Sequence, residues 1–226
     1  MTKKIGIEIN GVLRDTIEKF KQIYQKHLVD YNDVETIDKT YELEFSGETT
    51  EIDTMVENTN LKPFKYEILS DVNSLDLKNH FSFQNDEELY SFMFEEYTME
   101  LFGHAPSTEY NTFNILNELY YELRNDYDLI IVSDEIGKSK PASLFFLAKF
   151  GCLLEKVIFY SEVTKEKMWD EIDILITANP ELIKNKPENK LVIKFETKYN
   201  KDLECEFKIS TLSDFNLLLN KIKEYV

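Results

Sequence analysis

Residues 3–16 read KKIGIEINGVLRDT, and this stretch decides the fold. Its isoleucines alternate with other residues up to Gly11, a pattern that predicts a short buried strand ended by a turn. An amphipathic pattern over 14–28 then predicts a helix. A buried parallel strand that delivers polar side chains at its carboxyl end is a common place for a functional site. The polar side chains delivered here are Glu8 and Asn10.

The composition indicates an acidic globular protein. A chain of 226 residues suits one α/β domain with an insertion, or two small domains. Lysine and arginine number 26 against 43 aspartates and glutamates, which gives a formal net charge of −17. This charge argues against a nucleic-acid partner, which requires a basic surface, and against anionic membranes. It fits a soluble protein with a protein partner, or a homo-oligomer.

The cysteine content and the lengths of the apolar segments indicate the cellular compartment. Cys152 and Cys205 form neither a disulfide framework nor a metal pattern, so we expect reduced thiols. The N-terminal residues enter a strand directly, and no window approaches the roughly 18 apolar residues of a membrane span. We therefore expect a cytoplasmic protein. The abundance of Lys, Asn, Ile, Tyr and Phe is typical of AT-rich genomes, including those of many phages, and a phage protein would reside in the host cytoplasm or the virion.

Strand and helix patterns alternate regularly in the second half of the chain. The expected strands are 128–133, 156–161, 173–177 and 190–196, with a short edge strand at 208–210. The expected helices are 111–125, 140–150, 165–169, a brief helix opened by Asn179 and Pro180, and 212–225. Strands that alternate with helices predict an α/β fold with a three-layer, doubly wound parallel sheet and right-handed crossovers.

A long stretch between the first helix and the second strand interrupts this alternation. We therefore expect a core domain formed by 1–28 and 106–226, and an inserted, mainly α-helical cap formed by 29–105. Within the cap, 41–47 suggests an extended piece, 49–58 has helix-forming acids, and 86–102 predicts a helix capped by Asp86. Several aromatic residues suit either a cap core or a platform that stacks on a base: Phe81, Phe83, Phe92, Phe94, Tyr97, Phe102 and Trp169.

The first stretch resembles motif one of the haloacid dehalogenase-like (HAD) phosphatases, hhhDxDGVLxD, through Gly11, Val12, Leu13 and Asp15. The resemblance implies a HAD-like Rossmannoid core with a cap. In that family the first aspartate attacks phosphorus, and the second protonates the leaving oxygen. A Ser or Thr and a Lys hold the phosphate, and further acids bind Mg²⁺.

Both motif-one aspartates are replaced. Glu8 stands at the position of the nucleophile and Asn10 at that of the general acid/base. The extra methylene of glutamate moves the attacking oxygen, and a misplacement of about 1 Å can cost 10²-fold in rate. An asparagine amide can form hydrogen bonds but cannot transfer a proton as an acid. The alternative for both residues is a hydrogen-bonded polar plug at the end of a strand.

The candidates for phosphate binding are Ser133, Lys167 and Lys140. Ser133 ends an apolar strand and resembles the motif-two hydroxyl. Residues 164–181, TKEKMWDEIDILITANPE, resemble the corresponding stretch of the 5′(3′)-deoxyribonucleotidases, which gives Lys167 the position of the motif-three lysine, with Lys165 as the fallback. Lys140 follows Ser133 at the start of an expected helix, where a phosphate could bind. Solvated surface is the alternative for each lysine.

The metal-binding acids of motif four are absent. Thr177 and Ala178 stand at their positions, so the resemblance leaves Glu8 as the remaining motif carboxylate, with Asp15 or Asp134 to lend a second. Because Mg²⁺ is bound chiefly by carboxylates and substrate oxygens, we expect no resident cofactor, and Mg²⁺ only if activity is retained. The histidines are scattered and give no metal spacing: His27, His80 and His104.

These replacements predict a catalytically inactive HAD-like protein, nearest the deoxyribonucleotidase branch, that acts as a protein-binding or structural scaffold component. A fold can persist after its chemistry is lost. One alternative is a protein that binds a nucleotide or phosphate through Ser133, Lys167 and Lys140 without hydrolysis. The other is a weak Mg²⁺-dependent 5′-deoxyribonucleotidase or phosphatase.

Overall fold

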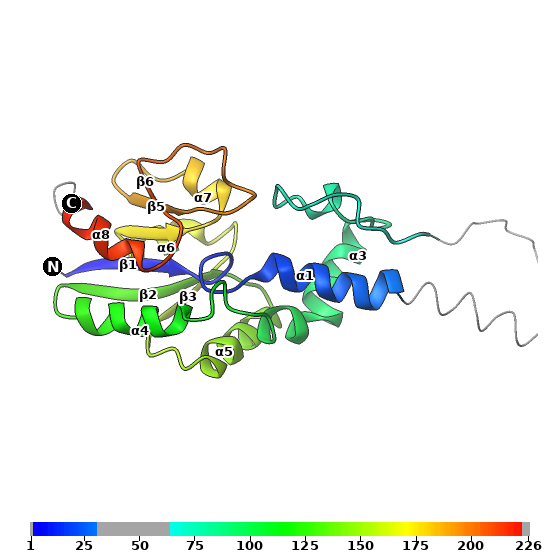
Figure 1. Ribbon diagram of the computed structural model, residues 1–226, viewed down its shortest axis with the longest axis horizontal. Coiled ribbons are helices and arrows are strands. Elements are labelled where there is room, and N and C mark those ends of the chain that lie inside the picture. The colour runs from blue at the N-terminus through cyan, green and yellow to red at the C-terminus, as the bar shows by residue number, and fades with distance from the viewer. Residues whose placement is uncertain (1, 31–63, 223–226) are drawn as a thin grey trace, which may run out of the picture.

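The computed structural model describes residues 2–30 and 64–222 (Figure 1). The expected extended piece at 41–47 and helical segment at 49–58 lie outside the described residues. No helix in the described part of the chain is both long and apolar enough to span a bilayer.

The described core contains a parallel sheet of six strands in the order β3-β2-β1-β4-β5-β6. The strands are β1 (Lys3–Glu8), β2 (Tyr127–Asp134), β3 (Val157–Tyr160), β4 (Ile174–Thr177), β5 (Leu191–Phe195) and β6 (Phe207–Ile209). β1 lies in the middle, with Ile7 opposite Ile131 of β2 and Ile176 of β4. This arrangement confirms the predicted doubly wound parallel sheet and places the motif-one strand at its centre.

Helices cover both faces of this sheet. The helices that follow the cap are α4 (Thr112–Leu123), α5 (Ser139–Lys149), α6 (Lys165–Glu171), α7 (Pro180–Lys184) and α8 (Asp214–Ile222). Each coincides with an expected helix to within a few residues at its ends, and Asn179 caps α7 by accepting a hydrogen bond from the Glu181 amide, 2.9 Å away. The chain therefore forms three layers, as the alternation of strands and helices predicts.

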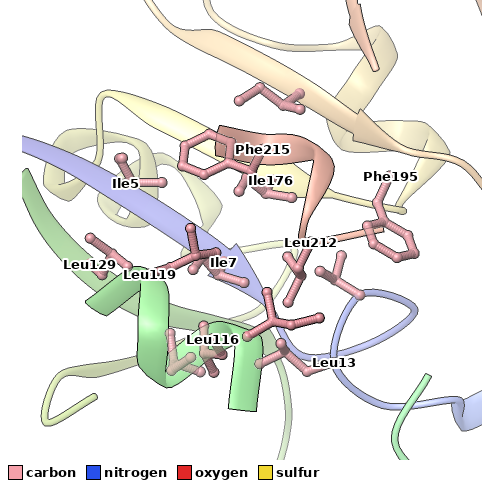
Figure 2. Packing of buried hydrophobic residues seen from close by; sticks show 14 of the residues in the cluster. Ile5, Ile7, Leu13, Leu116, Leu119, Leu129, Ile176, Phe195, Leu212 and Phe215 are labelled. Carbon is pink, nitrogen blue, oxygen red and sulfur yellow. The ribbon is translucent and has the colours of Figure 1, made fainter. Parts of the chain in front are cut away.

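The period-two pattern of the strands separates two hydrophobic clusters. On one face Ile5 and Ile7 of β1 pack with Leu116 and Leu119 of α4 and Phe215 of α8, as Figure 2 shows. On the other face, α6 and α7 cover side chains of β2, β4 and β5. The members of this second cluster include Ile130, Val132, Met168, Trp169, Leu175, Leu182 and Val192. Trp169 therefore belongs to the core layer, and the interpretation of this residue as part of the cap is wrong.

A third cluster joins the first helix to the described part of the expected cap. α1 (Thr16–Tyr24) extends from the end of β1 toward α3 (Asp86–Ser91) in Figure 1. Phe20 of α1 packs edge-on against Phe81 and Phe92, at centroid distances of 4.8 and 5.4 Å. Phe20, Phe81 and Phe92 are buried, so these three side chains form packing contacts.

The expected continuous helix over 86–102 is interrupted. α3 is followed by two π-helical turns, η3 (Phe92–Glu96) and η4 (Met99–Gly103), with a non-helical residue, Tyr97, between them. The cap of α3 is Asn85, whose side chain accepts a hydrogen bond from the Glu88 amide 2.8 Å away, and the prediction of Asp86 as the cap is wrong. Two further short turns are η1 (Gln25–Val29) after α1 and η2 (Leu77–Asn79).

The chain forms a tight turn directly after β1, at residues 9–14. The amides of Leu13 and Arg14 both donate to the Ile9 carbonyl, at 3.0 and 2.9 Å. Gly11 adopts a φ of 78°, which a side chain disfavours, and an added Cβ would overlap the Tyr199 hydroxyl and lie 2.8 Å from the Ala178 Cβ. This turn fixes the positions of Asn10 and Arg14.

Substitution Gly11→Ala is expected to lower the free energy of unfolding by about 1–3 kcal/mol, because the left-handed backbone and the overlap with Tyr199 both oppose a methyl group. Urea unfolding measures the loss. The double variant Gly11→Ala/Tyr199→Phe should recover part of it, since the phenylalanine removes the overlapping hydroxyl. A Gly11→Ala protein as stable as the wild type would contradict the tight turn.

Candidate functional site

The polar side chains that end the central strands meet at the carboxyl edge of the sheet. Glu8 ends β1, Thr177 ends β4 and Tyr160 ends β3. β3, β2, β1 and β4 are neighbours in that order in the parallel sheet, so their carboxyl ends lie along the same edge. The sequence predicted the positions of Glu8 and Thr177, whereas Tyr160 carries no motif signal and enters the site only through the fold.

Each carboxylate oxygen of Glu8 accepts a hydrogen bond from a hydroxyl group of the protein. The Tyr160 hydroxyl donates to Glu8 Oε1 at 2.7 Å, and the Thr177 hydroxyl donates to Oε2. The Thr177 oxygen in turn accepts from the Asn179 amide at 2.9 Å. Only 1% of the Glu8 surface is exposed, so both carboxylate oxygens face protein donors. This arrangement matches the hydrogen-bonded plug that was the alternative reading of the sequence at this position.

Burial dominates the proton affinity of this cluster. Desolvation raises the pKa of Glu8 to about 7, the hydrogen bonds from Thr177 and Tyr160 oppose the rise, and the nearby Asp134 carboxylate adds to it. Burial and the adjacent Glu8 likewise raise the pKa of Tyr160 well above its usual value. The pKa of Tyr199, which burial and Glu8 both raise, shifts in the same direction. Near neutral pH, Glu8 is therefore distributed between its protonated and ionised forms.

The Asn10 side chain acts as a hydrogen-bond acceptor. Its Oδ1 accepts from Arg14 Nη2 at 2.6 Å and from the Thr16 hydroxyl at 2.8 Å. The carboxamide oxygen is thereby directed at the protein's own donors. It is not free to bind a substrate or a metal ion.

Arg14 and Glu135 form a fully buried ion pair behind Asn10. Arg14 Nη2 lies 2.5 Å from Glu135 Oε1, and neither side chain is exposed. Arg14 Nη1 donates to the Phe102 carbonyl at 2.8 Å and to the Ser143 hydroxyl at 2.6 Å. Burial lowers the pKa of the guanidinium, and the Glu135 carboxylate opposes the shift. One side chain thus ties the motif-one turn to α5 and to the last turn of the described cap residues.

Sequence reasoning did not identify Arg14, Glu135 or Tyr199. One available signal was composition, because Arg14 and Arg124 are the only two arginines in the chain. The guanidinium of arginine is rigid and can donate several hydrogen bonds at once, which lysine cannot do. A rare arginine within an apolar turn therefore indicates a site that uses this geometry. Glu135 and Tyr199 carry no comparable signal, since each stands in an ordinary polar segment.

None of the three candidate phosphate-binding residues lines the cavity beside Glu8. Ser133 is buried, and its hydroxyl donates to Glu135 Oε1 at 3.2 Å. Lys167 is exposed on α6, and Lys140 is exposed on α5 with its ammonium 5.9 Å from the Phe159 ring centre. The fallback, Lys165, forms an ion pair with Glu162. The hydroxyl expected to hold phosphate therefore serves an internal carboxylate, and the lysines lie elsewhere.

A cavity of about 520 Å³ opens beside Glu8 and Asn10. It lies between the motif-one turn with the start of α1, the loop after β5 that contains Tyr199, and the described cap residues. Ser133, Lys140, Lys165 and Lys167 do not line it. Its polar and acidic lining includes Asp15, Glu18, Asp71, Asp134 and Asn179. Its apolar lining includes Val72, Leu75, Leu77, Met93, Phe94 and Phe102.

The donor set does not fit the Mg²⁺ ion that the HAD-like fold implies. Thr177 gives its hydroxyl hydrogen to Glu8, and the neighbouring Ala178 is buried and offers only a methyl group. Within residues 2–30 and 64–222, no group of three or more His, Cys, Asp or Glu side chains is arranged to hold a metal ion. Octahedral Mg²⁺ is bound chiefly by carboxylate oxygens, and both oxygens of the buried Glu8 already accept a hydrogen bond from a protein hydroxyl.

Comparison with known proteins supports the fold. No protein-family profile and no curated protein matches the sequence. Among solved structures, 17 chains match. One is a protein from Burkholderia xenovorans LB400 described as a haloacid dehalogenase-like hydrolase, with 9% identity, a TM-score of 0.52, and coverage of 97% of this chain and 98% of that chain. At this identity the likeness concerns the fold alone. The chain therefore has the haloacid dehalogenase-like fold that its first strand and turn predict.

Proposed function

We propose that this protein is a HAD-like protein that does not hydrolyse phosphate esters and works by binding. The observation that carries the proposal is that the protein's own donors occupy both motif-one side chains. Tyr160 and Thr177 bond the two oxygens of Glu8, and Arg14 bonds the oxygen of Asn10.

Phosphoryl transfer to a carboxylate needs an oxygen free to attack, a proton donor for the leaving group, and cations around the phosphate. Each oxygen of Glu8 already accepts a hydrogen bond inside a buried site, and such a bond lowers the nucleophilicity of the oxygen. Asn10 has no proton to lend as an acid. Lys140 and Lys167, the cations expected to hold the phosphate, do not line the cavity. The lysines that do line the cavity, Lys21 and Lys198, are exposed and are not those that the motifs predict.

An assay of phosphate release tests the proposal. We expect p-nitrophenyl phosphate, dUMP and dTMP, each with Mg²⁺, to be hydrolysed no faster by the wild type than by Glu8→Ala. Urea unfolding of both proteins shows that they are folded under assay conditions. Mg²⁺-dependent release by the wild type that Glu8→Ala abolishes would refute the proposal and favour the weak phosphatase.

The class of partner that the protein binds is less well supported than the absence of hydrolysis. A protein-binding or scaffold role remains a prediction from the net charge of −17, which favours a basic partner. Binding of a nucleotide without hydrolysis has less support, because none of Ser133, Lys140 and Lys167 lines the cavity beside Glu8. Membership of the deoxyribonucleotidase branch likewise remains a prediction from the 164–181 segment.

A further inference from the structure

We propose that the cavity beside Glu8 binds an organic cation with an apolar body, such as an aromatic or alkyl ammonium ion, in place of a phosphate ester. The inference rests on the proposed function, because it assigns a ligand class to a site that does not hydrolyse phosphate. It follows from three properties of the cavity: the sign of its charge, its apolar wall and its volume.

The charge of the lining is negative. Asp15, Glu18, Asp71 and Asp134 line the cavity together with the partly ionised Glu8, against two exposed lysines, Lys21 and Lys198. Two of these carboxylates also repel each other, since Asp134 adds to the larger effect of burial in raising the pKa of Glu8. A bound cation would relieve this repulsion, whereas a phosphate would add to it.

Two of these carboxylates are available to a ligand. Within residues 2–30 and 64–222, no hydrogen bond or ion pair reaches the carboxylates of Asp71 or Asp134. By contrast, Asp15 caps α1 by accepting from the Glu18 amide at 3.1 Å, and Glu18 accepts from Gln22. Asp71 and Asp134 come from the expected cap and from the end of β2. They therefore approach the cavity from two sides.

The apolar wall and the volume suit a small organic body. The rings of Phe94 and Phe102 stack at a centroid distance of 5.6 Å and an interplanar angle of 22°, and both line the cavity with Met93 and Leu77. Its volume of about 520 Å³ lies in the range of small-molecule pockets, which is about 300–1,000 Å³. The lining therefore matches a ligand with one cationic end and one apolar end.

Three probes that share one apolar body test the ligand class. They are 1-naphthylmethylammonium, 1-naphthylmethanol and 1-naphthyl phosphate, titrated calorimetrically into the full chain at low ionic strength with a chelator present. We expect the ammonium to bind about tenfold or more tighter than the alcohol, and the phosphate to bind weakest. Raising the salt should weaken the ammonium alone, since charge interactions are screened. Equal affinity of the ammonium and the alcohol, or tighter binding of the phosphate, would overturn the inference.

Matched charge removals locate the site. The double variant Asp71→Asn/Asp134→Asn should weaken ammonium binding by about fivefold to tenfold and leave the alcohol unchanged. Asp170→Asn, which removes an exposed aspartate on α6 outside the cavity, should leave both unchanged. An equal loss in the double variant and in Asp170→Asn, or no loss in either, would place the cation elsewhere and refute the inference.

The two proposals fail separately. Phosphate release in the assay described above would refute the proposed function whatever the titrations give. Tighter binding of 1-naphthyl phosphate without any release would refute the organic-cation site and leave the non-hydrolysing function intact.

Discussion

Replacement of Arg14 by methionine is expected to lower the free energy of unfolding by about 3–5 kcal/mol, because it leaves the buried Glu135 carboxylate without its ion-pair partner. Glu135 Oε2 has no hydrogen-bond partner among the described residues, so without Arg14 the carboxylate keeps only the neutral hydroxyl donors Ser133 and Ser143 on Oε1. The same change removes the Arg14 hydrogen bonds to Asn10, Ser143 and the Phe102 carbonyl. Equilibrium urea unfolding at neutral pH measures the loss.

Two further variants separate the charge from the geometry. Arg14→Lys keeps the positive charge but loses the planar fork, so its loss should lie between zero and that of Arg14→Met. The double variant Arg14→Met/Glu135→Leu removes both charges, and we expect it to be more stable than Arg14→Met alone. A loss below about 1 kcal/mol for Arg14→Met would show that the pair is solvated and not buried.

The stability of the wild type is expected to fall relative to Glu8→Gln as the pH rises. The pKa of folded Glu8 is raised from the usual 4.5 to about 7, so the folded protein holds this proton more tightly than the unfolded chain does. The stabilisation is therefore complete below about pH 4 and is lost as the pH rises through 7. A shift of this size corresponds to about 3 kcal/mol between pH 4 and pH 8.

Urea unfolding of both proteins from pH 4 to pH 8 checks this result. The difference between wild type and Glu8→Gln isolates one group, since the other carboxylates titrate in both proteins. Glu188→Gln, an exposed glutamate with no hydrogen bond to described residues, should track the wild type across the range. Parallel profiles for wild type and Glu8→Gln would mean that the Glu8 carboxylate is solvated.

Much of the fold could be predicted from the sequence because its signals are local. Alternating isoleucines marked β1, Pro180 and Asn179 marked the start of α7, and the regular alternation of strands and helices indicated a parallel sheet. The helix expected over 86–102 was the main exception. Its apolar periodicity is continuous, but tertiary packing of Phe92 and Leu101 against α1 holds it as separate turns with Tyr97 between them.

The candidate site, like the fold, has features that the sequence shows and features that it does not show. The sequence by itself determined which groups are present at the ends of the central strands: Glu8 and Asn10 for the first strand, and Thr177 and Ala178 for the fourth. That follows because motif positions are fixed by their spacing from a strand, which is a local property.

Only the tertiary structure decided what those groups bind. Tyr160 stands 152 residues from Glu8 in the sequence, and Glu135 stands 121 residues from Arg14. Partners this distant are chosen by the order of strands in the sheet and by the burial that forces each polar atom to find a donor or an acceptor. A buried carboxylate needs hydrogen-bond donors, and these can come from any part of the chain. The sequence shows that Glu8 and Glu135 are present, but it does not show which residues donate to them.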